Sequence, residues 1–321
     1  MRNKPIILIA GDPKSIFFEI LFKSLKKKEY QSPLVLICSK ELLNKQMKKF
    51  KFKKSLRILN NQELKNLNLN NNSINLIDVK LGFLSFKKHN KKIVHNYIEK
   101  SFNHAFKIIR DRVTNKLING PINKKTFLNK KYPGVTEYIS TKFNNKKIGM
   151  LIYNKKLSVC PLTTHLPIKL VAKKINKKLV AEKLDIIDKF FRKNFNIKPK
   201  IAVTGMNPHC ETTLKYNEDD KILRPVIKKK FNEGVKVSGP YPADTIFLTE
   251  NRKKFDVILG MYHDQVLGPF KTLFEYDAIN ITMGLPFLRV SPDHGPNQKM
   301  FGQNKSNPQS LINALDFLDN K

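Results

Sequence analysis

The chain is short of acidic residues. It carries 61 Lys and Arg against 26 Asp and Glu, which gives a formal net charge of +35 over 321 residues. Only eight of the cations are arginine, and the lysines lie in short scattered clusters instead of one tail or one helix face. The sequence also lacks a basic groove interleaved with aromatic residues and any known nucleic-acid-binding module. The charge therefore predicts a solvated basic surface, and a nucleic-acid-binding protein stays only as an alternative.

Cysteine and long hydrophobic runs are also scarce. The three cysteines, Cys38, Cys160 and Cys210, show no CxxC spacing, and an odd number fits a reducing compartment better than a disulfide framework. The apolar run near the N-terminus ends after six residues in Gly-Asp-Pro, and no later stretch approaches the length of a membrane span. We therefore expect a cytoplasmic protein without a signal peptide or a membrane partner.

Two glycine-rich nucleotide motifs are missing as well. No two glycines stand one residue apart, so there is no GxGxxG, and no glycine precedes a Lys-Ser or Lys-Thr pair as in a P-loop. If a nucleotide binds, it needs a site of another kind.

What is present is an alternation of short apolar runs with segments of helical periodicity. The predicted strands are residues 5–10, 33–38, 200–205 and 255–261, and the predicted helices are residues 16–26, 97–110, 180–191 and 308–318. Such alternation indicates an α/β fold with a largely parallel sheet covered on both faces. Ligands in these folds bind where strands end.

Four histidines stand where an apolar run gives way to turn residues. They are His165, His209, His263 and His294. Each alone could simply cap a strand. Together, three imidazoles at strand ends are the ligands that zinc and similar ions need, with one position left open for a substrate.

Cationic and amide side chains follow His263 along the chain. Gly268 and Pro269 predict a bend, after which come Lys271, Asn280 and Arg289. A planar guanidinium binds carboxylate or phosphate at two points, which lysine cannot reproduce. A salt bridge is the alternative role for the arginine. The grouping favours an anionic small molecule beside a metal ion.

Several longer motifs resemble the 4-hydroxythreonine-4-phosphate dehydrogenase family of vitamin B6 biosynthesis, in the order found there and over nearly the whole chain. They are GDPKSIFFEI (11–20), NGPINK (119–124), GVTEYI (134–139), TTHLPIKLV (163–171), GMNPH (205–209), GPYPADTIF (239–247), MYHDQVLGPFK (261–271) and INITMGLPFLRVSPDHG (279–295). The resemblance implies an α/β/α subunit of the isocitrate and isopropylmalate dehydrogenase type. One domain would combine residues 1–130 with 281–321, and residues 131–280 would carry the metal ligands and the dimer interface.

The resemblance also implies the site. The metal ligands would be His165, His209 and His263 of a site shared between the partners of a homodimer, and the ion would be Zn, Mg or Co. The substrate contacts would be Thr136, Lys271, Asn280 and Arg289, the catalytic residues Lys271 and Asp264, and the cofactor contacts His294 and Gly295. The cofactor would be NAD or NADP. The reaction would oxidise and decarboxylate 4-phosphooxy-L-threonine to 3-amino-2-oxopropyl phosphate.

The chain departs from the family pattern in four places. Val135 replaces a histidine, the stretch NPHCE is one glycine short, the segment after Gly295 reads PNQKMFG, and the first loop has Ser15, Phe17 and Phe18 where glycines and a proline are common. Valine cannot donate a hydrogen bond to a substrate. A sister dehydrogenase of 4-phosphothreonate or 4-phosphoerythronate and a catalytically weakened member therefore stay as alternatives.

Overall fold

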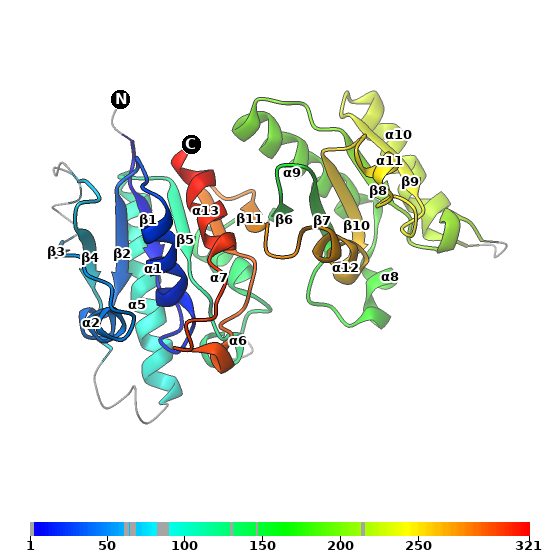
Figure 1. The fold of residues 1–321 in the computed structure, drawn as a ribbon. Coiled ribbons are helices and arrows are strands. Elements are labelled where there is room, and N and C mark those ends of the chain that lie inside the picture. The colour runs from blue at the N-terminus through cyan, green and yellow to red at the C-terminus, as the bar shows by residue number, and fades with distance from the viewer. Residues whose placement is uncertain are drawn as a thin grey trace. The chain divides into compact units, whose positions relative to one another are not determined.

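The computed structural model of the chain describes residues 3–60, 64, 69–81, 90–128, 131–145, 147–212 and 216–321. It divides into two compact units. The first unit combines Met1–Tyr138 with Pro286–Lys321, and the second unit is Ile139–Leu285 (Figure 1). That these units fold as separate domains with the expected boundaries stays a prediction.

The first unit is built on a parallel sheet. Its strand order is β3-β4-β2-β1-β5-β12, and neighbouring strands in this order pair in parallel. The strands are β1 (Ile6–Ile9), β2 (Leu34–Cys38), β3 (Leu56–Ile58), β4 (Ile74–Asp78), β5 (Lys116–Asn119) and β12 (Leu288–Pro292). The central strands β1, β2 and β5 are buried along their whole length, as expected for a sheet covered on both faces.

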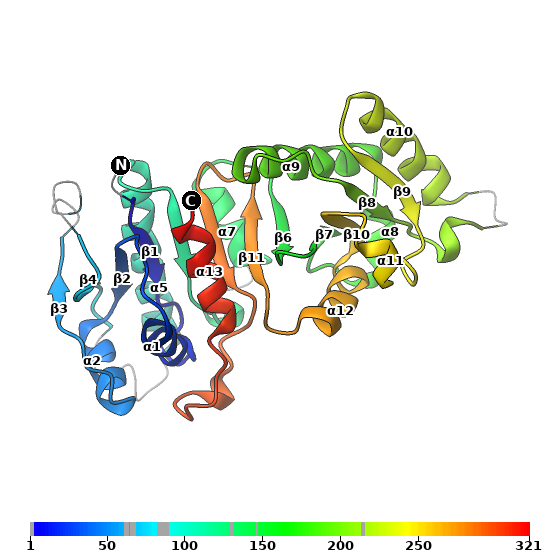
Figure 2. The same ribbon diagram turned by 45° about the horizontal axis from the view of Figure 1, so that its top comes forward.

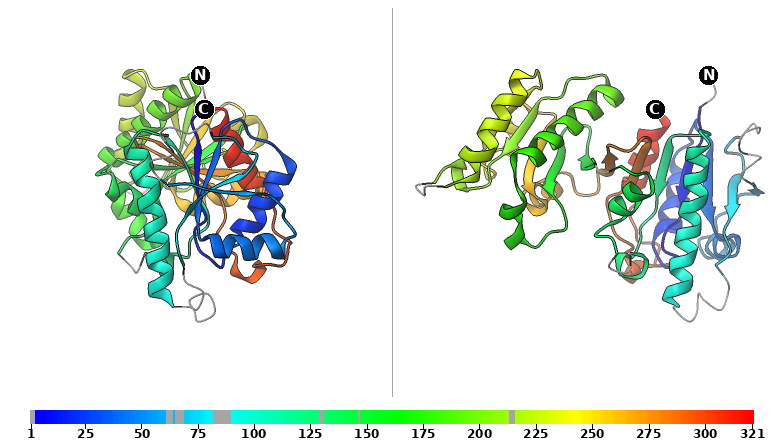
Figure 3. Two further views of the ribbon diagram at one scale, coloured as in Figure 1. Left: turned by 90° about the vertical axis from the view of Figure 1, so that its left-hand side faces the viewer. Right: turned by 180° about the vertical axis from the view of Figure 1, so that it is seen from behind.

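Helices cover both faces of this sheet. They are α1 (Phe17–Lys27), α2 (Lys40–Lys49), α5 (Lys91–Arg110) and α13 (Gln309–Asp319), with the short turn η4 (Gln298–Met300) before α13. The short helix α6 (Lys124–Phe127) contacts α5, and α7 (Val135–Lys142) begins in the first unit and ends in the second. α1 contacts α2 and α13, whereas α5 contacts β1 and β2. Figure 3 shows α5 on the face opposite α1 and α13. Side-chain caps from Ser39 and Asn90 fix the starts of α2 and α5.

The second unit has a mixed sheet of order β11-β6-β7-β10-β8-β9. β6 pairs antiparallel with β11 and β7, and the remaining pairings are parallel. The strands are β6 (Gly149–Tyr153), β7 (Ser158–Thr163), β8 (Ile201–Thr204), β9 (Val237–Tyr241), β10 (Val257–Tyr262) and β11 (Ile279–Met283). The parallel half carries the longer connections, which contain helices, as parallel pairing requires.

Helices also flank the second sheet. They are α8 (Val171–Lys174), α9 (Lys177–Phe195), α10 (Arg224–Asn232), α11 (Thr249–Arg252) and α12 (His263–Phe274), with the single turns η1 (Ile168–Leu170), η2 (Pro208–Cys210) and η3 (Asp219–Leu223). Figure 2 shows α9 and α12 on opposite sides of the sheet. No helix within the described residues combines the length and the apolarity that crossing a membrane requires.

The predicted elements are confirmed with small shifts in their ends, and α5 begins six residues before the predicted helix at residue 97. The bend predicted at Gly268 and Pro269 is wrong, because α12 runs through both residues. Val266 and Phe270 of this helix are fully buried, and their burial against the sheet outweighs the backbone hydrogen bond that proline cannot make.

Candidate active site

The three histidines expected to bind metal follow three neighbouring strands of the second unit. β10 lies between β7 and β8 and is parallel to both, so the carboxyl ends of these strands share one edge of the sheet. His165 follows β7, His209 lies in η2 after β8, and His263 is the first residue of α12 after β10. This edge is where open α/β sheets bind their ligands.

Two of these histidines are close neighbours. The ring centroids of His165 and His263 lie 6.2 Å apart. Because a metal-bound imidazole nitrogen sits about 2.0–2.1 Å from the ion, two rings at this separation can bind one ion between them. His209 is exposed, and the described residues contain no group of three His, Cys, Asp or Glu side chains with metal-binding geometry. The donor set of one chain therefore fits part of a metal site.

The histidine loops have an uncommon backbone conformation. His165, His209 and Cys210 have φ values of 47°, 55° and 60°. Residues other than glycine rarely adopt this left-handed region, and when they do the surrounding structure has to hold them there. Such conformations gather at functional sites, which agrees with a ligand-binding role for both loops.

Asp264 lies beside His263. Its Oδ1 is 2.8 Å from His263 Nδ1, and the aspartate side chain is 88% exposed while that of the histidine is 39% exposed. A carboxylate bonded to one ring nitrogen orients the imidazole and leaves the other nitrogen for a metal ion. The geometry therefore suits Asp264 to orienting the ring.

Arg289 and Thr136 are brought together in the first unit. Arg289 is 3% exposed; its Nε donates to Asn119 Oδ1 at 2.7 Å and its Nη1 to Thr136 Oγ1 at 3.4 Å. Burial lowers the pKa of Arg289 from 12.5 to about 10, while the negative charge of Glu137 acts in the opposite direction. The guanidinium is thus still a cation at neutral pH, in a place where a bound anion would be strongly attracted.

Asn119 is the contact that sequence reasoning missed. It ends β5, which pairs in parallel with β12, and Arg289 is in register with Leu117. The sequence does point to this residue, because Asn119 is the first residue of the motif NGPINK. An amide that accepts from a buried guanidinium fixes the direction of that cation.

Lys271 and Asn280 both belong to the second unit. Lys271 lies in α12, and its Nζ is 3.5 Å from the carbonyl oxygen of Glu275. Asn280 lies in β11, and its Oδ1 is buried without a hydrogen-bond partner among the described residues. An unsatisfied buried amide oxygen is costly, so a ligand that donates a hydrogen bond there would be favoured.

The residues expected to contact the cofactor follow β12 in the first unit. His294 Nδ1 is 3.0 Å from the carbonyl oxygen of Gly295, and the backbone of Pro296 accepts from Ile16 N at the start of α1. Gly295 is exposed, and a side chain placed on it would meet nothing within 4 Å. No side chain therefore blocks the approach of a ligand to the backbone at Gly295.

Phe17 and Phe18 do not line that loop. Both are buried in the core of the first unit, at 0% and 2% exposure. The two phenylalanines therefore add to the packing of the core. They do not contribute to the exposed surface of the loop.

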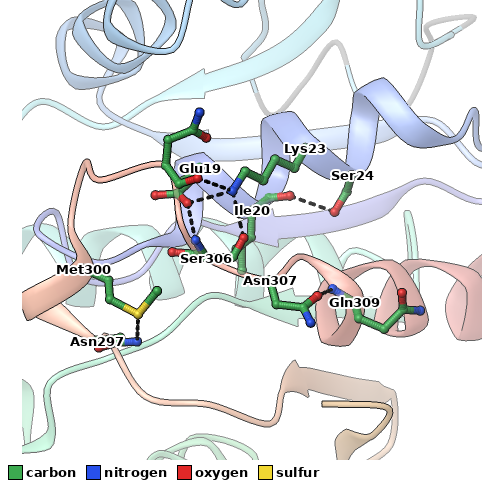
Figure 4. A network of polar contacts seen from close by, with 10 residues as sticks. Glu19, Ile20, Lys23, Ser24, Asn297, Met300, Ser306, Asn307 and Gln309 are labelled. Atoms are coloured by element: carbon green, nitrogen blue, oxygen red, sulfur yellow. Dashed lines mark hydrogen bonds and ion pairs between the residues drawn. The ribbon is translucent and has the colours of Figure 1, made fainter. Parts of the chain in front are cut away.

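A polar network fixes the segment after Gly295 to α1. Glu19 Oε1 accepts from Lys23 Nζ at 3.0 Å and from the backbone nitrogen of Ser306, and Lys23 Nζ also donates to the carbonyl oxygens of Asn304 and Ser306 at 2.9 and 2.8 Å (Figure 4). The Glu19 side chain is 1% exposed. This ion pair, in which the carboxylate is buried, anchors the far end of the segment.

Comparisons with known proteins give the family. The model of the family described as pyridoxal phosphate biosynthetic protein PdxA matches residues 29–318. The 4-hydroxythreonine-4-phosphate dehydrogenase of Sulfurihydrogenibium sp. (strain YO3AOP1) is 36% identical over 97% of this chain and 96% of its own length. The D-threonate 4-phosphate dehydrogenase of Salmonella typhimurium is 30% identical over 98% of each chain.

A solved structure agrees with the architecture. The structure of 4-hydroxythreonine-4-phosphate dehydrogenase from Klebsiella pneumoniae has a TM-score of 0.83 at 28% identity and covers 98% of this chain and 97% of its own. The expected α/β class with largely parallel sheets is thereby confirmed. The chain belongs to the PdxA family of dehydrogenases.

Proposed function

We propose that this chain is an NAD-dependent, divalent-metal-dependent dehydrogenase that converts 4-phosphooxy-L-threonine into 3-amino-2-oxopropyl phosphate and carbon dioxide. The observation that carries the proposal is the pair His165 and His263, whose ring centroids lie 6.2 Å apart at neighbouring strand ends. Membership of the PdxA family supports the reaction class.

The metal would be held by His165 and His263 of one chain, with the set completed by the partner subunit of a homodimer. His209 is exposed in each chain and is thus available across such an interface. Imidazole ligands favour zinc or cobalt over magnesium. When bound, the ion would supply Lewis-acid polarisation of the hydroxyl oxygen of the substrate.

Each unit also offers side chains that could bind an anionic substrate. Arg289, supported by Asn119, attracts a phosphate or carboxylate, and Thr136 adds a hydroxyl. Asn280 offers a buried amide oxygen to a donor group of the substrate. Lys271 supplies a cation on α12 and is the residue we assign to proton transfer.

The proposed reaction has two steps, an oxidation and a decarboxylation. The substrate hydroxyl loses a proton and the hydride on the same carbon passes to NAD, which yields a ketone and NADH. The bond to the carboxylate carbon then breaks, carbon dioxide leaves, and the remaining carbon takes up a proton. His294 and Gly295 would lie against the cofactor.

A second candidate is the oxidation of D-threonate 4-phosphate. Val135 begins α7 directly before Thr136, whose hydroxyl meets Arg289. A half-buried valine changes the hydrogen bonding next to this anion site, because it has no donor. The full-length relative from Salmonella typhimurium carries that name.

The test is an assay of purified protein with either substrate, NAD and Zn²⁺, Mg²⁺ or Co²⁺, read by the absorbance of reduced nicotinamide. We expect turnover of 4-phosphooxy-L-threonine that is lost with a chelator and in His263→Ala. Turnover restricted to D-threonate 4-phosphate would select the second candidate. No turnover of either substrate by metal-loaded dimer would reject the dehydrogenase and favour a catalytically weakened member.

A further inference from the structure

The side-chain amide of Gln265 links two strand ends of the second unit. Its Oε1 accepts from the backbone nitrogen of Met261 at 2.7 Å and from Thr204 Oγ1 at 2.8 Å, and its Nε2 donates to the carbonyl oxygen of Gly205 at 2.8 Å. Met261 belongs to β10, which leads into His263, and Thr204 ends β8. One amide therefore sets the position of both strand ends relative to each other.

A third strand end joins this set through Thr163. The hydroxyl of Thr163, which is 5% exposed, donates to the carbonyl oxygen of Met261 at 2.8 Å. Thr163 ends β7 and stands two residues before His165. The main-chain nitrogen and oxygen of Met261 thus connect, through the side chains of Gln265 and Thr163, all three strands from which the histidine loops emerge.

Asp219 organises the loop that follows β8. It is fully buried; its Oδ1 accepts from Met206 N at 2.8 Å, and its Oδ2 accepts from Asn207 N at 3.0 Å and Asn207 Nδ2 at 2.8 Å. A side chain on Gly205 would lie 2.5 Å from Cys210 Sγ, so the loop is folded tightly on itself. Charge-assisted bonds of this kind are strong, and they fix the start of the loop that carries His209.

We propose that Gln265 and Asp219 are positioning residues of the metal site, acting through the backbone segments that carry His165, His209 and His263. The inference rests on the proposed function, because it takes these histidines as ligands. Within the described residues the bonds of both side chains go to Thr204 and to the backbone and amide groups of the loops, so their effect is on the position of the ligands. Groups outside the ligand shell that orient ligands typically change metal affinity by about 10–100-fold when they are mutated.

The experiment measures the affinity of the full chain for Co²⁺ alone, without NAD or substrate. Competition with a chromophoric chelator gives the dissociation constant, and the visible absorption of bound Co²⁺ reports the ligand geometry. The variants are Gln265→Met, which keeps the length of the side chain and removes its three hydrogen bonds, and Asp219→Asn, which keeps its shape and removes the charge.

The matched control is Asn154→Ala. Asn154 is a 7% exposed amide of the same unit, and its Nδ2 donates to Asp277 Oδ2 at 3.0 Å and to the carbonyl of the same residue. Its loss also removes partly buried hydrogen bonds, but none of them joins the histidine loops. The control therefore separates lost stability from misplaced ligands.

We expect Gln265→Met to bind Co²⁺ at least about 10-fold more weakly with an altered absorption spectrum, and Asp219→Asn to show a smaller loss. Asn154→Ala should bind as wild type does. Wild-type affinity and a wild-type spectrum in Gln265→Met would overturn the inference but leave the proposed function standing. If Gln265→Met does not fold, wild-type affinity and spectrum in Asp219→Asn would overturn the inference instead. A wild-type chain that binds no Co²⁺ would overturn the metal-dependent function and the inference with it.

Discussion

The guanidinium of Arg289 donates from Nε to Asn119 Oδ1 over 2.7 Å while only 3% of the residue is exposed. Lysine is a point charge and cannot keep this contact together with the one to Thr136. Hydrogen bonds to charged groups contribute about 1.5–3 kcal/mol. Arg289→Lys should therefore raise the KM for the phosphorylated substrate by about 10–100-fold, as measured by steady-state kinetics with saturating NAD and metal.

Arg192→Lys is the matched control for that change. Arg192 Nε bonds Asp188 Oδ2 at 2.7 Å, but its side chain is 49% exposed. Exposed pairs within a helix contribute about 0.3–0.5 kcal/mol, so the KM should stay within about twofold. An unchanged KM in Arg289→Lys would contradict an anion-binding role for the buried arginine.

The placement of the histidines could be predicted because parallel strands end at one edge of a sheet. The apolar runs before His209 and His263 formed β8 and β10, and these strands are neighbours. Strand order was not predictable from spacing, since β7 pairs with β10 across nearly a hundred residues. Whether one chain brings two or three imidazoles together depends on loop conformation, which no periodicity encodes.

The supporting residues were harder to find from sequence. Gln265 and Asp219 are ordinary polar residues in the sequence, and their roles appear only once the main-chain groups around them are located. Gly268 and Pro269 show the opposite case. This pair strongly predicts a bend, but the packing of α12 overrides that local preference and the helix continues through both residues. Local chemistry thus predicted which strand ends carry the histidines better than which residues support their loops.

The cysteines should be unreactive in the folded protein. All three are free and buried, and burial raises the pKa of the thiols of Cys160 and Cys210 from 9.0 to about 11. The thiolate is the reactive form, so at pH 8 these groups stay protonated and reactivity should rise only as the pH approaches 11.

Labelling with a chromogenic disulfide reagent tests this expectation. At pH 8 native protein should react far more slowly than protein in denaturant, where three thiols should be titrated. Rapid labelling of one thiol in the native protein would contradict the burial. Peptide mapping would then identify which of the three cysteines is accessible.

Pro269→Ala should stabilise the second unit. Pro269 lies inside α12, where it lacks the nitrogen-bound hydrogen that a helix interior uses. Proline costs about 3 kcal/mol in such a position relative to alanine, and part of this is offset because proline also restricts the unfolded chain. We expect a gain of about 1–2 kcal/mol in the free energy of unfolding, measured with urea.

The control for that substitution is Pro225→Ala. Pro225 is exposed and lies in the first turn of α10, where proline is well tolerated. This change should alter stability by less than about 0.5 kcal/mol. A loss of stability in Pro269→Ala would mean that α12 needs the proline ring for packing.

Lys23→Met should release the segment that follows Gly295. Lys23 Nζ bonds Glu19, Asn304 and Ser306, and the Glu19 side chain is 1% exposed. Removing the cation leaves the buried Glu19 carboxylate without its ion-pair partner. We expect this to lower the free energy of unfolding by about 1–3 kcal/mol, less than for a fully buried pair, since Lys23 is partly exposed. Local opening should then let proteases cleave the backbone more readily at the lysines of this segment.

Limited trypsin digestion followed by mass spectrometry provides the measurement. Cleavage after Lys299 and Lys305, both exposed, should be several-fold faster in Lys23→Met than in wild type. Lys28→Met is the control, because Lys28 pairs with Asp316 at the surface with 47% of its side chain exposed, and pairs of this kind contribute about 0–1 kcal/mol. Equal cleavage rates in both variants would show that α13, and not the Glu19 ion pair, keeps this segment in place.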